Sequence, residues 1–329
     1  MNTKFIISVV VSLLFINAFS QNKKETLSKD KGLSKHPFLY VGEWDTRKPK
    51  EQSMFIVRDG KLDWQYSIPM KTATGAIQEF DDVTMLSNGN IVFACMSGAG
   101  IITPEKNLIW EYHCEKGTET HSIQPIGKDS VMMMLNANSA KILIFNTAEN
   151  KLLKEILIPT TNTNTHGQFR HVRITNKGTI MVPHLSENKV VEYTMDGEAI
   201  WSVKSKSPWA AIRLKNGNTL ISGDRSQYTR EVNPKGETVW ELTQKDVPFT
   251  LYNTQTANRL ANGNTVITNW CAGIKNTEEW ANTVQVFEVT PSKEVVWKLS
   301  SWDNPDLGPS TYIQLLDEIG NPDNGELQR

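Results

Sequence analysis

The stretch WAAIRLKNGNTLISG at residues 209–223, followed by YTREVNPKGETVWEL at residues 228–242, decides the fold of this chain. It holds four short runs in which apolar and polar residues alternate, which predicts four β-strands. Asn216-Gly217 separates the first two runs, and Lys235-Gly236 separates the last two. An Asn-Gly pair between apolar runs favours a tight hairpin, because both turn positions need a positive φ. The segment therefore predicts one antiparallel sheet of four strands.

The same unit recurs along the chain, and its first turn can be followed through five glycines. These are Gly89, Gly127, Gly178, Gly217 and Gly263, which lie 38, 51, 39 and 46 residues apart. Periods of this length are typical of one four-stranded blade of a β-propeller. The copy around Gly127 is the weakest, because its last strand carries no Trp. The sequence thus contains five complete blades.

A sixth blade is predicted from the two segments that lie outside the five complete blades, one near each end of the sequence. Residues 38–66 read as the last three strands of a blade that lacks its first strand, and residues 312–317 read as a first strand with nothing after it. Pairing the two would close the ring and remove the sheet edges that an open fan would expose. We therefore predict a six-bladed, all-β propeller closed by the C-terminal strand, with seven blades as the main rival.

The remaining segments divide the chain into four parts. Residues 1–20 carry an apolar run, Phe5 to Ile16, that is too short to span a membrane and precedes small residues, as in a cleaved signal peptide. Residues 21–36 are polar and rich in Lys, which predicts a flexible leader. We expect a single propeller domain over 37–318 and a tail over 319–329. The mature protein is then periplasmic or extracellular, without a membrane span.

Composition excludes several kinds of partner. A net charge of −1 gives no reason to expect nucleic acid or an anionic membrane as a partner. Three cysteines, Cys95, Cys114 and Cys271, do not make a disulfide framework, although one disulfide stays possible. No Cys or His spacing matches a known metal motif, so neither a metal nor a cofactor is expected. We expect a monomer.

Recurring tryptophans occupy one position in the outermost strand of most blades, and we expect them to pack between neighbouring blades rather than to bind a ligand. They are Trp64, Trp110, Trp201, Trp240 and Trp297.

Loop length identifies the functional face. The first-to-second and third-to-fourth strand turns are short and share one face, whereas the other connections are long, and binding residues usually lie on long loops. His121 and His171 begin innermost strands there and are candidate acid–base residues. Each histidine could instead satisfy a backbone carbonyl. The candidate ligand-binding residues are Gln168, Arg170, Arg225, His184, Trp209, Trp270, Asp82 and Asn253. The two arginines could instead form ion pairs with Asp82 or Asp224. The two tryptophans could instead pack within the loops.

The repeat also carries a family resemblance. The unit from Asn216 to Glu241 resembles the repeats of arylsulfotransferase-like propellers and, more loosely, those of pyrroloquinoline-quinone-type propellers. The first resemblance implies a channel histidine that accepts a sulfuryl group; His121, His171, Arg170 and Arg225 fit by residue type, without a motif that matches residue by residue. The whole chain, including LGPSTYIQLLDE at 307–318, is similar to uncharacterised exported propellers of Bacteroidetes-type bacteria. That similarity implies a cell-envelope setting, often alongside glycan breakdown.

Two functions remain open from the sequence. The first is a binding propeller that holds a small polar ligand, anionic or glycan, at the channel mouth. The second is an enzyme, such as a sulfuryl transferase, glycan hydrolase or lyase, that uses a channel histidine.

Overall fold

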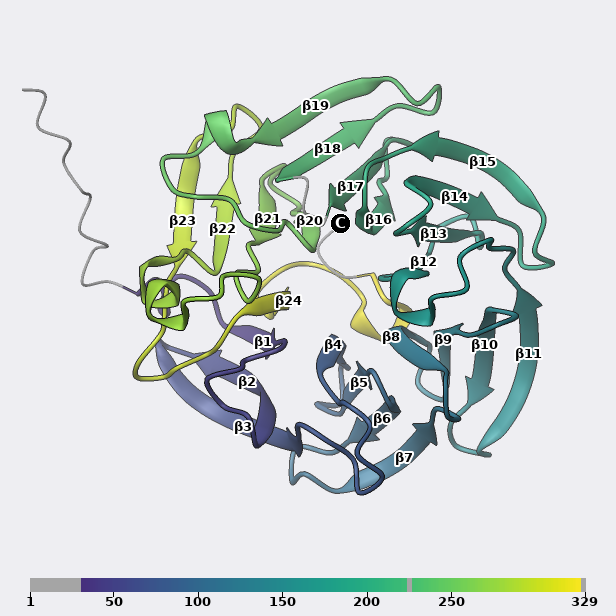
Figure 1. Cartoon of the computed structure of the whole chain (residues 1–329). Helices are drawn as coiled ribbons and strands as arrows, with labels where there is room; N and C mark the ends of the chain where they lie inside the picture. The colour runs from purple at the N-terminus through teal and green to yellow at the C-terminus, as the bar shows by residue number, and fades with distance from the viewer. Residues whose placement is uncertain (1–30, 224–226, 327–329) are drawn as a thin grey trace, which may run out of the picture.

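The computed structural model describes residues 31–223 and 227–326, and these form a ring of six four-stranded antiparallel sheets (Figure 1). The predicted signal peptide and the candidate Arg225 lie outside the described residues. Within the described ranges, no helix is long and apolar enough to cross a membrane. All three cysteines are free.

Blade 1 combines the two ends of the chain, and each other blade is built from four consecutive strands. The strands are β1 (Phe38–Gly42), β2 (Glu51–Arg58), β3 (Lys61–Pro69) and β24 (Ser310–Leu315) in blade 1; β4 (Phe80–Met85), β5 (Ile91–Cys95), β6 (Gly98–Ile102) and β7 (Leu108–His113) in blade 2; β8 (Glu119–Ile126), β9 (Ser130–Asn136), β10 (Lys141–Asn146) and β11 (Lys151–Leu157) in blade 3; β12 (Arg173–Ile174), β13 (Ile180–His184), β14 (Lys189–Tyr193) and β15 (Ala199–Lys204) in blade 4; β16 (Pro208–Arg213), β17 (Thr219–Gly223), β18 (Tyr228–Val232) and β19 (Thr238–Thr243) in blade 5; and β20 (Ala257–Arg259), β21 (Thr265–Thr268), β22 (Val286–Val289) and β23 (Val295–Leu299) in blade 6.

The C-terminal strand closes the ring as the sequence predicts. β24 is the innermost strand of blade 1 and pairs antiparallel with β1, from Phe38 opposite Leu315 to Val41 opposite Tyr312. Figure 1 shows the yellow β24 beside the purple β1 at the centre of the ring. The blade count of six and the closure are therefore confirmed, and the rival count of seven is excluded.

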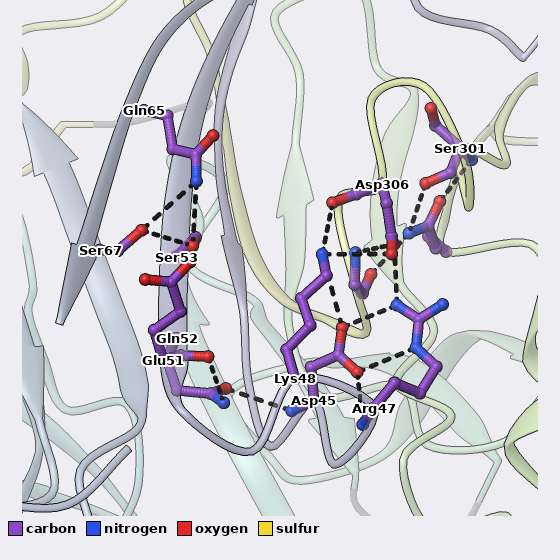
Figure 2. A network of polar contacts seen from close by, with 12 residues as sticks. Asp45, Arg47, Lys48, Glu51, Gln52, Ser53, Gln65, Ser67, Ser301 and Asp306 are labelled. Carbon is purple, nitrogen blue, oxygen red and sulfur yellow. Dashed lines mark hydrogen bonds and ion pairs between the residues drawn. The ribbon is translucent and has the colours of Figure 1, made fainter. Parts of the chain in front are cut away.

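A polar network reinforces this closure on the long-loop face. Arg47, in the β1–β2 loop, donates to both carboxylate oxygens of Asp45 at 2.9 and 2.7 Å and to Asp306, before β24, at 2.8 Å. Lys48 adds an ion pair with Asp306 at 3.2 Å (Figure 2). The Arg47 guanidinium also lies 5.0 Å from the ring centre of Trp302, within the range of a cation–π contact. The network joins the β1–β2 loop to the segment that precedes β24.

The recurring tryptophans pack between blades, which confirms their structural interpretation. Each one donates its indole N–H to the next blade or, for Trp297, to the segment before β1. Trp64 donates to the Pro104 carbonyl at 2.8 Å, and Trp201 donates to the Pro234 carbonyl at 2.8 Å. In every blade a β-bulge adjoins this position, and its extra residue directly precedes the position in the outermost strand. The bulge bends the strand at the point where the blades meet.

Blade 3 uses an ion pair at the same position. Lys154 lies next to the bulge and pairs with Ile144. Trp110 has the equivalent position in blade 2, where it lies next to the bulge and pairs with Ile101. The ammonium of Lys154 lies 2.9 Å from Asp196 in the β14–β15 turn of blade 4. The missing Trp of this repeat is therefore replaced by a charged contact to the same part of the next blade.

A buried ion pair crosses the central channel. Asp82 on β4 accepts from both terminal nitrogens of Arg173 on β12 at 2.8 Å, and the backbone N–H of Ile123 on β8 donates to Asp82 at 3.0 Å. Asp82 is fully buried. Burial raises the pKa of Asp82, but the charge of the neighbouring Arg173 outweighs it, so the pKa is lowered to about 2. Three consecutive blades are joined at this point.

Two short segments outside the expected limits of 37–318 also pack on the propeller. The carbonyl of Gly32 accepts the indole N–H of Trp297, and Leu33 is buried beside it. At the other end, Asp323 in the short helix η4 (Pro322–Asn324) accepts from the backbone and hydroxyl of Ser87. The contacts of the propeller therefore extend beyond the expected limits of the domain at both ends.

The equivalent positions in blades 2 and 3 provide a matched stability test. Trp110→Ala removes a buried side chain and its hydrogen bond to Asn150, which we expect to lower the free energy of unfolding by about 3–5 kcal/mol. Lys154→Ala removes a partly exposed ion pair and should cost at most about 1 kcal/mol. Denaturant unfolding measures both. Equal losses in the two variants would contradict the packing role of the Trp.

Asp82 also makes a pH prediction. Its folded pKa of about 2 lies below its ordinary value of 3.8, so its stabilisation is present above pH 4 and is lost as the pH falls towards 2. Asp82→Asn leaves Arg173 buried without a counter-charge and should cost about 3–5 kcal/mol at pH 7. The variant should then lose less further stability than the wild type between pH 4 and 2, as measured by thermal unfolding. Parallel pH curves for the two proteins would rule out the assigned role.

Candidate functional site

A cavity of about 570 Å³ opens on the long-loop face, and all six blades contribute to its wall. The blade-to-blade crossings and the second-to-third strand loops supply the lining, as the sequence predicts for this face. The lining residues are Glu43, Trp44, Ile77, Glu79, Met96, Glu119, Asn164, His166, Gly167, Arg170, Leu185, Ser186, Ser207, Trp209, Gln255 and Trp270. Only a closed ring brings such distant segments to one point.

Three carboxylates gather at one side of this cavity. Glu43 follows β1, Glu79 precedes β4, and Asp81 lies on β4; all three are buried, and their oxygens lie within 4.8 Å of one another. Burial and the neighbouring Asp81 charge raise the pKa of Glu43 to about 8. Burial and the charges of Glu43 and Asp81 also raise the pKa of Glu79 well above its ordinary value. Buried carboxyl groups with raised pKa values are typical of functional sites.

A chain of hydrogen bonds leads from this cluster to two histidines. His121 is buried, with Nδ1 2.8 Å from Asp81 and Nε2 2.9 Å from Glu119. The same Glu119 oxygen lies 3.1 Å from Nδ1 of His166, whose side chain is 52% exposed. Burial raises the pKa of Glu119, but its bonds to the two histidines outweigh this and hold the pKa well below its usual range. Burial and the charge of Arg170 lower the pKa of His121. The carboxylates of Asp81 and Glu119 outweigh both effects, so the pKa is raised overall.

Arg170 and Trp209 form another part of the wall. The guanidinium of Arg170 lies 4.7 Å from the ring centre of Trp209, which is a cation–π distance. Arg170 donates to the carbonyl of Phe169 at 2.9 Å, while its Nε and the Trp209 indole N–H are buried without a partner. The predicted pairing of Arg170 with Asp82 does not form, because Arg173 occupies both oxygens of Asp82. Arg170 is therefore left to face the cavity.

Trp44 joins this wall with an unusual backbone. Its φ of 56° lies in the left-handed region, which is uncommon for a residue with a bulky side chain. Strained conformations of this kind cluster at functional sites.

His171 lies away from the cavity lining. It is buried, stacks on Tyr312 with ring centres 5.6 Å apart, and accepts from Arg173 through Nδ1 at 3.2 Å. Burial outweighs the nearby Asp82 charge and lowers its pKa, which favours the neutral ring. His121 is enclosed as well, so neither predicted catalytic histidine lines the cavity. His166 is the histidine that does.

Several other predicted residues hold loops in place. The side-chain oxygen of Gln168 accepts from the backbone N–H of Ala137, and its side-chain nitrogen donates to the Ala137 carbonyl. His184 is buried between Glu187 and the hydroxyl of Tyr193, and burial lowers its pKa to about 4. Trp270 lines the cavity, and its indole donates to the carbonyl of Glu43 at 3.3 Å. Asn253 supports Trp270 through its side-chain amide at 3.4 Å.

Sequence reasoning placed the key acids on the correct face but did not select them. Glu43, Glu79 and His166 are in long connections and Glu119 is the first residue of β8, and no local motif distinguishes them from solvent-exposed residues. Among the described residues, two groups have donor atoms close enough to hold a metal ion: Glu119 with His121 and His166, and Glu43 with Glu79 and Asp81. The site can bind polar groups, transfer protons, or do both.

No protein-family model matches the sequence, and no curated protein matches it either. Among solved structures, a protein of unknown function from Bacteroides caccae superimposes with a TM-score of 0.73 and 22% identity, over 84% of this chain and 98% of that chain. A catalytically inactive histidine-to-alanine variant of virginiamycin B lyase from Staphylococcus aureus, solved with quinupristin, has a TM-score of 0.53 at 13% identity, over 79% of this chain and 88% of that chain. A streptogramin B lyase has a TM-score of 0.52 at 12% identity, over 82% of this chain and 90% of that chain.

At these identities the likeness shows the fold alone, and the resemblance to arylsulfotransferase repeats stays a prediction. The chain is a six-bladed β-propeller that shares its fold with a Bacteroides protein of unknown function and with propeller-shaped lyases.

Proposed function

We propose that this protein binds a small, hydroxyl-rich ligand, such as a glycan fragment, in the cavity at the channel mouth. The observation that carries the proposal is the wall itself: Trp44, Trp209 and Trp270 border the same cavity as Glu43, Glu79 and Glu119. Aromatic rings offer apolar faces to a sugar ring, and carboxyl groups accept or donate hydrogen bonds to its hydroxyls. A pocket with a few convergent polar groups is the usual form of a small-molecule site.

The charges favour a neutral ligand over a simple anion. Arg170 is the cavity's only arginine among the described residues, and it lies close enough to the buried Glu43 and Glu79 to act on their pKa values. Glu119, whose pKa is lowered, lines the same cavity and offsets the charge of Arg170, so a simple anion would gain little there. The sequence-based expectation of an anionic ligand depended on Arg170 together with Arg225, which lies outside the described residues.

Trp209 provides the test of binding. Trp209→Ala removes the aromatic face and should weaken glycan binding at least tenfold, about 1.4 kcal/mol, in isothermal titration after a thermal-shift screen of glycan fragments, aryl sulfates and organic anions. Trp209→Phe is the matched control, because it keeps an aromatic face and loses an indole N–H that has no partner. Unchanged affinity in the Ala variant, or selective binding of the anions, would contradict the proposal.

A second candidate is an acid–base enzyme at the same cavity, a hydrolase or lyase. It is favoured by one observation: Glu43 and Glu79 have raised pKa values, whereas Glu119, which lines the same cavity, has a lowered one. When the environment raises the pKa of one carboxyl group and lowers that of another, the first can act as the general acid and the second as the general base. Two fold neighbours are lyases, one of them inactivated by a histidine-to-alanine change. In this chain the cavity-lining His166 is better placed than His121 or His171 to meet a substrate.

Glu79→Gln tests the enzyme candidate. The variant keeps the shape and the hydrogen-bonding capacity of the side chain but cannot supply a proton, so turnover of a bound glycan should fall at least 100-fold while affinity stays within about threefold. Wild-type turnover should also decline as the pH rises through the raised pKa of Glu79, where this carboxyl group loses its proton. Full activity in Glu79→Gln would exclude Glu79 as the acid.

A further inference from the structure

We infer that Glu119, His121 and His166 form a binding site for one transition-metal ion of the Zn²⁺ type, with an open coordination position towards the cavity. The inference deepens the proposed function, on which it rests for the role of the cavity. The sequence gives no sign of such a site, since Glu119 and His121 lie at the start of β8 whereas His166 lies in the crossing between β11 and β12.

The donor atoms converge on one point. Oε2 of Glu119 lies 2.9 Å from Nε2 of His121 and 3.1 Å from Nδ1 of His166, and all three atoms lie within 4.8 Å of one another. Ligand atoms about 2.0–2.1 Å from a tetrahedral Zn²⁺ are about 3.3 Å apart. The observed separations are close to that value, so small side-chain movements are enough to admit an ion between them.

The three side chains also have the chemistry of a known donor set. Two imidazoles and one carboxylate hold Zn²⁺ in several hydrolytic enzymes, and imidazole nitrogen favours Zn²⁺ and its neighbours over Mg²⁺ or Ca²⁺. The cluster of Glu43, Glu79 and Asp81 offers only oxygen and is a less selective alternative. The histidine-containing group is therefore the better candidate.

A carboxylate behind His121 orients it for this role. Asp81 accepts from Nδ1 of His121 at 2.8 Å, which leaves Nε2 to face Glu119 and His166. Metal-bound histidines almost always donate their other N–H to a carboxylate or carbonyl, which fixes the ring and strengthens the ligand. His121 and Asp81 are both about 1% exposed, so this orientation is held by the core of the propeller.

The remaining coordination position faces the cavity. Glu119 and His166 both line it, whereas His121 closes the site from behind. Three protein ligands with one open position are typical of catalytic rather than structural zinc sites. Arg170, 3.4 Å from Nε2 of His166, opposes a cation, but the carboxylates of Glu119 and Asp81 lie against the two nitrogens of His121 and offset that charge.

An exposed His–Glu pair elsewhere provides a control. His113 lies 3.2 Å from Glu111 at the outer edge of blade 2, with side chains 77% and 52% exposed. It has the same residue types as the proposed site but no third donor and no cavity.

The experiment uses the purified protein after dialysis against a chelator, without glycan. Titration calorimetry with Zn²⁺ at pH 7 should show one ion per chain, with Mg²⁺ and Ca²⁺ at least 100-fold weaker. His166→Ala and Glu119→Gln should each lower the Zn²⁺ affinity at least 100-fold, and Asp81→Asn about 10–100-fold. His113→Ala should leave it unchanged. Repeating the titration in buffers of different ionisation enthalpy should reveal proton release, because the ion displaces protons from the histidines.

His166 is exposed, so His166→Ala is expected to fold, and circular dichroism checks this. Absence of Zn²⁺ binding by the wild type, equal affinity in His166→Ala, or an equal loss in His113→Ala would each overturn the metal site. The two proposals fail separately. Glycan binding without Zn²⁺ binding rejects only the metal, and Zn²⁺ binding without any glycan binding rejects only the glycan.

Discussion

The backbone pairing of β24 with β1 is the interaction on which the rest of this structure depends. A blade without its innermost strand would expose an unpaired sheet edge, and the ring would be open between blades 1 and 6. The pairing removes this edge, and the ion network of Asp45, Arg47 and Asp306 fastens the same two segments above it. Because blade 1 contains both ends of the chain, the ring forms only when residues almost 280 positions apart meet, as Phe38 and Leu315 do.

Closure also creates the environment of the candidate site. Six innermost strands leave a narrow channel, and the polar groups that reach it are shielded from water by the blades around them. Asp82 and Arg173 neutralise one another there, with two hydrogen bonds between them. Within the described residues, Glu43 and Glu79 form no such ion pair, and burial together with the neighbouring carboxylates raises their pKa values. The same ring therefore produces a buried ion pair and, in the cavity wall, a group of acids with raised pKa values.

The contacts between blades follow a rule with one exception. In most blades a Trp directly after a β-bulge contacts a turn of the next blade, and Lys154 with Asp196 takes that role between blades 3 and 4. The exception falls where the sequence repeat is weakest. A charged pair at this place costs little at an exposed rim, where water still solvates both groups. The propeller thus tolerates a change of chemistry at the rim that its buried centre would not tolerate.

The sequence by itself determined the blade unit, the count of six, the closure and the face that carries long loops. Those features are local: alternation gives strands, Asn216-Gly217 and its equivalents give turns, and the leftover strands at the two ends require one another. Only the tertiary structure decided which loop residues meet. Glu119, at the start of β8, and His166, in the crossing before β12, are 47 residues apart, yet they share a hydrogen bond. Asp82 takes Arg173 as its partner rather than Arg170, because the position of each side chain around the channel, and not its place in the repeat, sets the distance between charges.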